Sequence, residues 1–191
     1  MPSPEVSRVF ICIELPSSIR AQGDELQRTL GTLDRHIRWV KPSNLHLTLR
    51  FLGEISGARV ESVCSSVQRV ASRVEPFLVH LSGTGCFPSL RRPRAFWIGV
   101  GENQNLTHLF KVLEDELFSS GFAHETRPFS PHLTLGRIRV DRVSARVREA
   151  LASTKFEAAP FAVTHVTLMQ SELRNSGSVY TPLAQAPLKL T

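Results

Sequence analysis

The sequence predicts an α+β fold made of two similar lobes that are related by a pseudo-twofold axis, with a groove between them. The strongest observation is the tetrapeptide His-Leu-Thr-Leu, which occurs at residues 46–49 and again at residues 132–135. The two copies lie 86 positions apart, close to half of the 191-residue chain, as expected for a duplicated lobe. Strand and helix patterns also recur in both halves, and no low-complexity linker divides them. We therefore expect residues 1–191 to form a single domain of two interleaved lobes, each with an antiparallel sheet, flanking helices and one motif.

The first half of the chain shows two helical patterns between apolar runs of strand length. Leu26, Leu30 and Leu33 recur at helical spacing, and a stripe of valines from Val60 to Val74 does the same. Apolar and polar residues alternate through the first motif, which is the two-residue period of a half-buried strand; Gly53 is expected to end it. The predicted elements are strands at 9–15, 37–40 and 45–52 and helices at 19–33 and 57–74.

The second half repeats this order. Leu106, Leu109, Phe110, Leu113 and Leu117 form one apolar helical stripe, and Gly121 is suited to the position just after the helix. The stretch 83–94 is rich in Gly, Pro and Arg and is expected to be a loop. The predicted elements are strands at 77–82, 95–100, 131–138, 161–170 and 179–183, helices at 106–120 and 140–151, and a turn at 171–177.

The two motifs place chemistry-bearing side chains on one face of each strand. Residues two apart on a strand point to the same side, so His46 and Thr48 share a face, and His132 and Thr134 do likewise. Imidazole titrates at about pH 6.5, so two histidines can act as acid and base near neutrality. Two hydroxyls can donate hydrogen bonds to phosphate oxygens. This set suits phosphoryl transfer without a metal ion.

A third, similar string, His165-Val166-Thr167-Leu168, tests this interpretation. A single His-x-Thr in a strand is usually a solvated strand face. His165 follows the second motif by only 33 positions and lacks the proline-bearing approach that precedes His46 and His132. We therefore predict a structural role for His165 and chemistry for the other two histidines.

The amino-acid composition indicates a globular protein. A hydrophobic content of 41% is that of an ordinary globular chain, and no apolar run approaches a membrane span. The N-terminus lacks the pattern of a signal peptide. Three scattered cysteines without a Cys-x-x-Cys pair are expected to be reduced thiols in a cytoplasmic protein.

The net charge of +6 favours a polyanionic partner. Arg91, Arg92 and Arg94 form a dense cluster, while Lys41, Arg50, Arg127 and Arg137 lie close to the two motifs in sequence. These residues could form an ordinary solvated basic face or a surface that follows phosphates. Their position beside the motifs favours the second interpretation.

The strings at residues 44–53 and 128–137 resemble the LigT/ThpR branch of the 2H phosphoesterase superfamily, and the resemblance covers nearly the whole chain. It implies a bilobed α+β fold and hydrolysis of RNA 2′,3′-cyclic phosphates to 2′-phosphomonoesters without a metal or cofactor. It also implies a reversible, ATP-independent 2′-5′ RNA ligase activity. The expected partner is RNA with a 2′,3′-cyclic phosphate or a 2′-5′ linkage, with tRNA halves as one candidate. We expect a monomer that does not associate with membranes.

The resemblance also implies residue roles. His46 would be the proton donor and His132 the proton acceptor, with Thr48 and Thr134 beside them. Arg137 would contact phosphate, Phe51 would stack on a base, and Arg50 and Phe129 are assigned to substrate binding with them.

Strand geometry qualifies three of these assignments. On a regular strand Arg137 would point away from His132 and Phe51 away from His46, because each lies an odd number of residues after its histidine. A bulge at Gly136 could re-aim Arg137. Arg50 lies at an even offset and would share the face of His46.

Two rival functions remain open at this level. One is another 2H activity, on small cyclic nucleotides or as an exonuclease at RNA 3′ ends. The other is a non-catalytic module that binds RNA or nucleotides. No His-Glu-x-x-His string, zinc-spaced Cys/His pair or phosphate-binding Gly-rich loop with Lys competes with the double motif.

Overall fold

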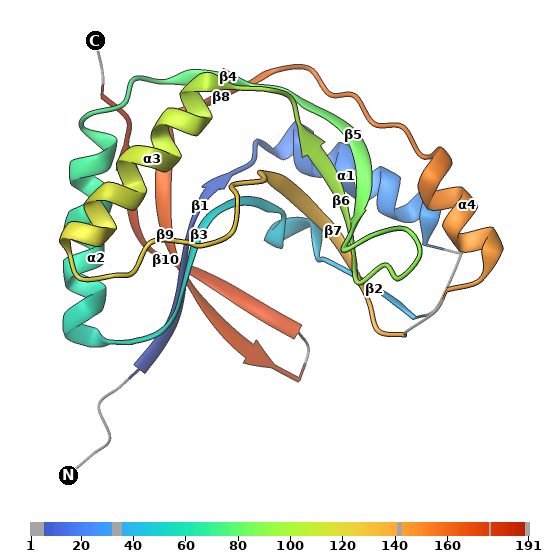
Figure 1. Ribbon diagram of the computed structural model, residues 1–191, viewed down its shortest axis with the longest axis horizontal. Helices are drawn as coiled ribbons and strands as arrows, with labels where there is room; N and C mark the ends of the chain where they lie inside the picture. Colours follow the sequence, from blue (N-terminus) through green and yellow to red (C-terminus); the bar gives the residue numbers. More distant parts are fainter. Residues whose placement is uncertain (1–5, 32–35, 141–142, 176, 190–191) are drawn as a thin grey trace.

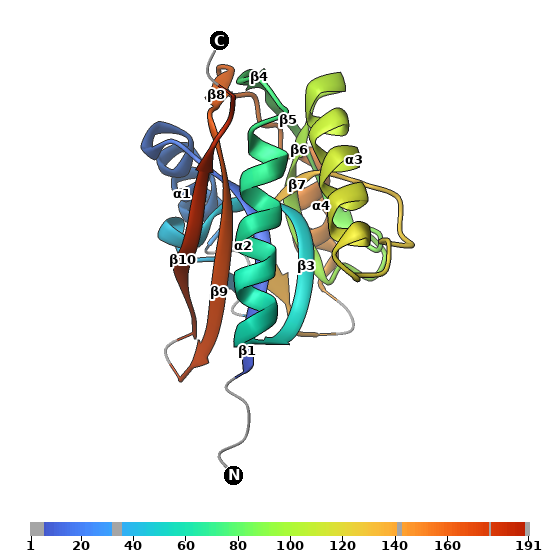
Figure 2. The same cartoon turned by 90° about the vertical axis from the view of Figure 1, so that its left-hand side faces the viewer.

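A computed structural model describes residues 6–31, 36–140, 143–175 and 177–189 of the chain. Within these residues four α-helices pack on a curved antiparallel sheet of eight strands, and two further strands pair apart from it (Figures 1 and 2). The strands are β1 (Val6–Glu14), β2 (Ile37–Trp39), β3 (His46–Ser56), β4 (Phe77–Val79), β5 (Leu81–Phe87), β6 (Ala95–Val100), β7 (His132–Ile138), β8 (Phe161–Val163), β9 (His165–Arg174) and β10 (Gly177–Pro187). The helices are α1 (Ser17–Leu30), α2 (Gly57–Ala71), α3 (Gln104–Ser119), α4 (Ala145–Ser153) and the short 3-10 turn η1 (Pro42–Asn44).

The strand order confirms the predicted pair of similar lobes. Along the sheet the order is β10-β9-β1-β3-β7-β6-β5, with β2 also paired to β7. The units β1-α1-β3-α2-β4-β5 and β6-α3-β7-α4-β8-β9 therefore occupy equivalent places about the centre of the sheet. That centre is the junction of the two motif strands, which meet through the antiparallel pair Leu47 and Leu133.

The helices cross between the two halves. α2 lies against α3 on one side, whereas α1 lies against β7 and α4 against β5 on the other (Figure 1). The amide of Gln27 on α1 donates to the Leu135 carbonyl of β7 over 2.8 Å, and this buried bond fixes α1 on the second lobe. Each lobe is thus covered by one helix from each half of the chain, which interleaves the lobes.

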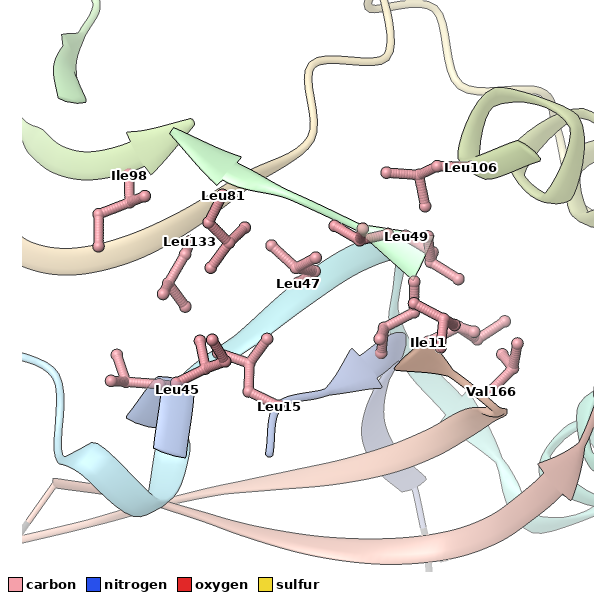
Figure 3. Close-up of a cluster of buried hydrophobic side chains, with 14 of the residues drawn as sticks. Ile11, Leu15, Leu45, Leu47, Leu49, Leu81, Ile98, Leu106, Leu133 and Val166 are labelled. Carbon is pink, nitrogen blue, oxygen red and sulfur yellow. The ribbon is translucent and has the colours of Figure 1, made fainter. Parts of the chain in front are cut away.

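The core lies between the sheet and the helices. The apolar positions of the motifs, Leu47, Leu49, Leu133 and Leu135, are at most 5% exposed and point into it. Figure 3 shows Leu47 of β3 beside Leu133 of β7 in this cluster. Because side chains alternate along a strand, the polar residues of both motifs are left on the opposite face of the sheet, here called the motif face.

Several predicted boundaries were wrong for identifiable reasons. Gly53 does not end β3; it adopts φ +73° at an irregularity in the pairing with β1, and the strand continues to Ser56. The predicted loop at 83–94 begins later than expected: residues 83–87 belong to β5, in which Gly85 leaves room for the Trp97 ring of β6, and residues 88–94 form the connection. The predicted turn at 171–177 is mostly strand, because β9 and β10 form a long hairpin.

One further prediction is confirmed, and two concern residues that the structure does not describe. Gly121 follows α3 with φ +82°, as predicted. The last two residues of the predicted helix 19–33 and positions 141–142 of the predicted helix 140–151 lie outside the described residues; the described part of the latter is helical from Ala145. Among the described helices, none has both the length and the apolar character needed to cross a membrane.

Candidate active site

The junction of β3 and β7 brings the two motifs together. In an antiparallel pair, the residue before one partner lies opposite the residue after the other. The pairing of Leu47 with Leu133 therefore sets His46 across from Thr134 and Thr48 across from His132 on the motif face. The four predicted residues form one site, although 86 positions separate the histidines in the sequence.

His46 is held with one ring nitrogen fixed. Its Nδ1 lies 2.7 Å from the carbonyl oxygen of Asn44, which can only accept, so Nδ1 carries a proton. In the neutral ring Nε2 is then the acceptor, and it lies 3.0 Å from the Thr48 hydroxyl. The rings of Phe10 and Tyr180 lie against the imidazole, with centroids 4.7 and 5.4 Å away.

His132 is held in the same way from the second lobe. Its Nδ1 donates to the carbonyl oxygen of Ser130 over 2.7 Å, again two residues before the histidine. Phe87 meets the ring edge to face at 4.8 Å, and Trp97 lies 6.2 Å away. Each histidine therefore has a fixed tautomer and an aromatic enclosure, and its Nε2 is the ring nitrogen that does not bond to the main chain.

The surroundings lower the pKa of both imidazoles. Burial is the largest cause at His46 and at His132, and the positive charge of Arg137 lowers both pKa values further. The carbonyl acceptors, Asn44 for one ring and Ser130 for the other, work in the opposite direction because they stabilise the protonated ring. The mutual effect of the two histidines also lowers the pKa of His46.

Arg137 reaches the motif face through a bulge. Phe96 of β6 pairs with Gly136 and Trp97 pairs with Thr134, so Leu135 is an extra residue in β7. This extra residue reverses the alternation beyond it. Arg137 is consequently exposed on the side of His132 and Thr134, as the predicted bulge requires, and its charge acts on both histidines.

Bulges in β3 reverse the expectation for Arg50 and Phe51. Cys12 pairs with Thr48 and Ile11 pairs with Arg50, which leaves Leu49 as an extra residue. Arg50 therefore points toward the helices and not to the motif face. The prediction that it shares a face with His46 was wrong. Its guanidinium pairs with Glu114 at 3.3 Å and with Glu125 at 3.1 Å.

The same bulge brings Phe51 to the motif face. Phe51 is 52% exposed, and its ring lies 5.7 Å from that of Phe10, which in turn contacts His46. An exposed aromatic ring at this place has the position that a base-stacking surface needs, although the odd offset had argued for a core position.

Two other residues lie apart from the histidines. The Phe129 ring stacks on Phe110 of α3 at 4.0 Å, so this residue, expected to bind substrate, packs against a helix. His165 shares a hydrogen bond with Thr164, and Thr167 donates to Glu14. In these contacts the third string meets neither His46 nor His132.

Sequence reasoning missed the aromatic residues around the histidines and a pocket beside His46. The pocket has a volume of about 320 Å³ and includes Glu14, Arg20, Lys41, Asn44 and Tyr180 in its lining. These residues come from β1, α1, the turn before β3 and β10. No local pattern could have found them, because only the folded sheet brings these segments together. In the described part of the chain, no three His, Cys, Asp or Glu side chains are grouped so as to hold a metal ion.

Comparison with known proteins gives a consistent result. The family model described as LigT like Phosphoesterase matches twice, over residues 13–97 and 98–180. A protein of Methanothermobacter thermautotrophicus named RNA 2′,3′-cyclic phosphodiesterase is 31% identical over 177 residues, which cover 92% of this chain and 96% of the relative. A protein of Aquifex aeolicus with the same name is 32% identical, with 93% and 95% covered.

Solved structures agree. A crystal structure of a protein from Thermus thermophilus superposes with a TM-score of 0.83 at 28% identity, covering 95% of this chain and 98% of the other. E. coli LigT in complex with 3′-AMP superposes with a TM-score of 0.75 at 31% identity, covering 97% of this chain and all of the other. The two matches of the family model divide inside β6, close to the boundary between the two structural halves.

Proposed function

The chain belongs to the LigT-like phosphoesterase family, and from this premise we propose that it hydrolyses RNA 2′,3′-cyclic phosphate ends to 2′-phosphomonoesters. The observation that carries the proposal is the pair of imidazoles, each with Nδ1 bound to a carbonyl oxygen and Nε2 left for proton transfer at one site. The curated relatives that bear the name RNA 2′,3′-cyclic phosphodiesterase support the substrate.

The reaction displaces the 3′ oxygen from phosphorus by water. In the proposed mechanism Nε2 of neutral His132 takes a proton from the water as its oxygen attacks phosphorus. Protonated His46 gives its Nε2 proton to the departing 3′ oxygen, which leaves the phosphate on the 2′ oxygen. Each transfer typically contributes ~10²–10⁴ in rate.

The remaining groups stabilise charge. Thr48 and Thr134 would donate to the non-bridging oxygens, where negative charge grows in the transition state, and Arg137 would offset that charge from the same face. Binding of the anionic phosphate raises the pKa of a nearby imidazole, which favours the protonated His46 that the acid role needs. Ligation without ATP would follow the same direction with a 5′-hydroxyl in place of water: His132 takes the hydroxyl proton, the 3′ oxygen leaves with the proton of His46, and a 2′-5′ linkage forms. In the reverse reaction, cleavage of a 2′-5′ linkage to the cyclic phosphate, the histidines exchange roles.

The proposed partner is RNA that ends in a 2′,3′-cyclic phosphate or carries a 2′-5′ linkage, with tRNA halves as a candidate. The complex of E. coli LigT with 3′-AMP supports a nucleotide as ligand. We propose a cytoplasmic monomer, with no cofactor; the free thiols Cys12, Cys64 and Cys86 support a reducing compartment.

The test is an analysis of products. An oligoribonucleotide with a 2′,3′-cyclic phosphate end is incubated with the protein in excess chelator, and the ends are resolved as 2′- or 3′-phosphates. We expect 2′-phosphate ends and an unchanged rate in chelator. A 3′-phosphate product, or activity that returns only with an added metal, would contradict the proposed mechanism.

The same assay separates the rival functions. Cyclic mononucleotides tested in parallel would identify a small-molecule phosphodiesterase, and a ladder of shortened RNA would identify an exonuclease. Binding without turnover would identify a non-catalytic module.

A further inference from the structure

We propose that Arg50 is a positioning residue that ties the first motif strand to the loop leading into His132, and so holds the two histidines in register. The inference rests on the proposed function in one respect: the kinetic test measures the rate of the proposed reaction. Arg50 follows Thr48 by two positions on β3, and the loop comprises residues 123–131.

The guanidinium of Arg50 contacts this loop and the helix before it with all three nitrogens. Nε lies 3.3 Å from a carboxylate oxygen of Glu114, Nη1 lies 3.1 Å from Glu125, and Nη2 donates to the carbonyl oxygen of Ala123. The side chains are largely buried, with exposed fractions of 11% for Arg50 and 9% for Glu114. The planar guanidinium reaches all three groups at once, whereas the single ammonium of a lysine cannot. The contact with Ala123 is a hydrogen bond, and the contact between Nε and Glu114 is an ion pair, since both atoms are buried without a hydrogen bond.

Glu114 completes the tie from α3. Its second carboxylate oxygen accepts the backbone N–H of Glu125 over 2.7 Å, so the loop is held by main-chain as well as side-chain contacts. A hydrogen bond from Arg127 lowers the pKa of Glu125 to about 2, so this partner of Arg50 stays ionised well below neutral pH.

The loop has a direct bearing on catalysis because it carries the group that orients His132. Ser130 supplies the carbonyl oxygen that accepts from His132 Nδ1, five residues after Glu125. The two motif strands themselves meet through the single pair Leu47 and Leu133 in the described ladder. Arg50 adds a second connection between them, from the strand of one histidine to the segment that sets the other.

A neighbouring ion pair provides a matched control. Arg69 of α2 pairs with Glu116 of α3 at 2.7 Å, and Glu116 is as buried as Glu114. This pair joins two helices and touches neither motif strand nor the loop. Loss of Arg69 should therefore reproduce the general cost of loosening α3 without disturbing His132.

The experiment compares Arg50→Gln, Arg50→Lys and Arg69→Gln. Turnover of a minimal cyclic-phosphate dinucleotide is measured for each, together with the melting temperature and the pKa of both catalytic imidazoles by NMR titration. For both Arg50 variants we expect kcat to fall ~10²-fold with KM within about twofold, since misplacement by about 1 Å can cost that much. For Arg69→Gln we expect a lower melting temperature and an unchanged kcat.

The imidazole titration separates positioning from charge. Loss of the Ser130 contact should lower the pKa of His132 in both Arg50 variants, because that carbonyl stabilises the protonated ring. Removal of a positive charge alone would raise it, and Arg50→Lys, which keeps the charge, should show the lowered pKa as well. The pKa of His46 should stay within a few tenths.

The outcomes decide the proposal. A raised or unchanged pKa of His132 in the Arg50 variants overturns it, as does a kcat that falls equally in Arg69→Gln. Should Arg50→Gln fail to fold, Arg50→Lys carries the same test. The titration needs no substrate, so an inactive wild-type protein would refute the proposed function while the positioning role was still measured.

Discussion

The two histidines are set by the same local device, a carbonyl oxygen two residues earlier in the chain. Asn44 supplies it for His46 and Ser130 for His132, each at 2.7 Å. Because a carbonyl oxygen cannot donate, the device fixes Nδ1 as the protonated nitrogen and leaves Nε2 for the proton transfer of the proposed mechanism. The repeated sequence motif thus encodes a repeated tautomer as well as a repeated pair of side chains.

This symmetry predicts the effect of removing each ring. His46→Ala and His132→Ala should each lower turnover by ~10²–10⁴. The double variant should lose less than the product of the two, because acid and base act as a unit. His165→Ala should keep most of the activity, since that ring bonds to Thr164 and not to the site. The measurement is turnover of four variants with matched melting temperatures; a folded but inactive His165→Ala would contradict the assignment.

The lowered pKa values predict the pH dependence of kcat/KM. This parameter reports the free enzyme, in which burial and the charge of Arg137 favour the neutral rings. The acid limb, set by His132, and the alkaline limb, set by His46, should therefore both lie at lower pH than an unperturbed imidazole would give. Arg137→Gln removes a positive charge that disfavours protonation, so both limbs should move to higher pH. A profile of kcat/KM from pH 4 to 9 checks this; limbs that stay in place would show that Arg137 does not act on these rings.

At the scale of the strands, bulges decide which side chains reach the motif face. The sequence alternation correctly placed His46, Thr48, His132 and Thr134, because all four precede the first bulge of their strand. Beyond the extra residues Leu49 and Leu135 the alternation reverses. Strand periodicity alone therefore exchanged the places of Arg50 and Phe51, and it could place Arg137 only by supposing a bulge. A bulge depends on the pairing with a neighbouring strand, which the sequence of one strand does not contain.

The strand pair β5–β6 offers a test of the aromatic enclosure around His132. A Cβ added at Gly85 would lie 2.4 Å from the Trp97 ring, so Gly85→Ala must displace that ring. Trp97 packs on Phe87, and both rings lie beside His132. We expect kcat to fall about tenfold, a modest case of the penalty for misplaced catalytic groups.

The control for this prediction is Gly83→Ala in the same strand. Gly83 adopts φ +70° with no atom near an added Cβ, so alanine there should cost roughly 1–2 kcal/mol of stability through backbone strain alone. Its kcat should be unchanged. Steady-state kinetics and Trp fluorescence distinguish the two; equal kcat values in both variants would show that the Trp97 ring does not support His132.

At the scale of the whole molecule, the sequence predicted the duplication and two interleaved lobes, but not which helices cross between them. Duplication is visible in the spacing of the motifs, whereas the packing of α1 on β7 depends on contacts such as Gln27 with Leu135, 108 positions apart. That the entire chain forms one cooperative domain remains a prediction. The crossing helices and the continuous sheet favour it, since each lobe needs a helix from the other half of the chain to complete its cover.

The basic character of the chain also acts at this scale, through the loop that joins β5 to β6. Arg91, Arg92 and Arg94 are exposed on it. The loop begins just after Phe87, whose ring contacts His132, and the backbone N–H of Arg94 donates to the Phe87 carbonyl over 2.7 Å. The cluster therefore lies on a loop whose start adjoins His132, which is the position expected of residues that hold RNA beside the scissile phosphate.

Neutralising the three arginines together should weaken the binding of longer RNA and spare the chemistry. KM for an oligonucleotide should rise, and the slope of log KM against log salt should fall by about 2, at roughly 0.7 per phosphate contact on a single strand. Meanwhile kcat for a minimal dinucleotide should stay within about twofold of the wild-type value, because no proton-transfer group is altered.

The control removes three exposed charges from helices on the other face of the sheet, Arg28, Lys111 and Arg146. If that control changes the salt slope as much as the loop variant does, the effect belongs to net charge and not to this loop; a large loss of kcat on the dinucleotide would place the arginines in the catalytic site itself.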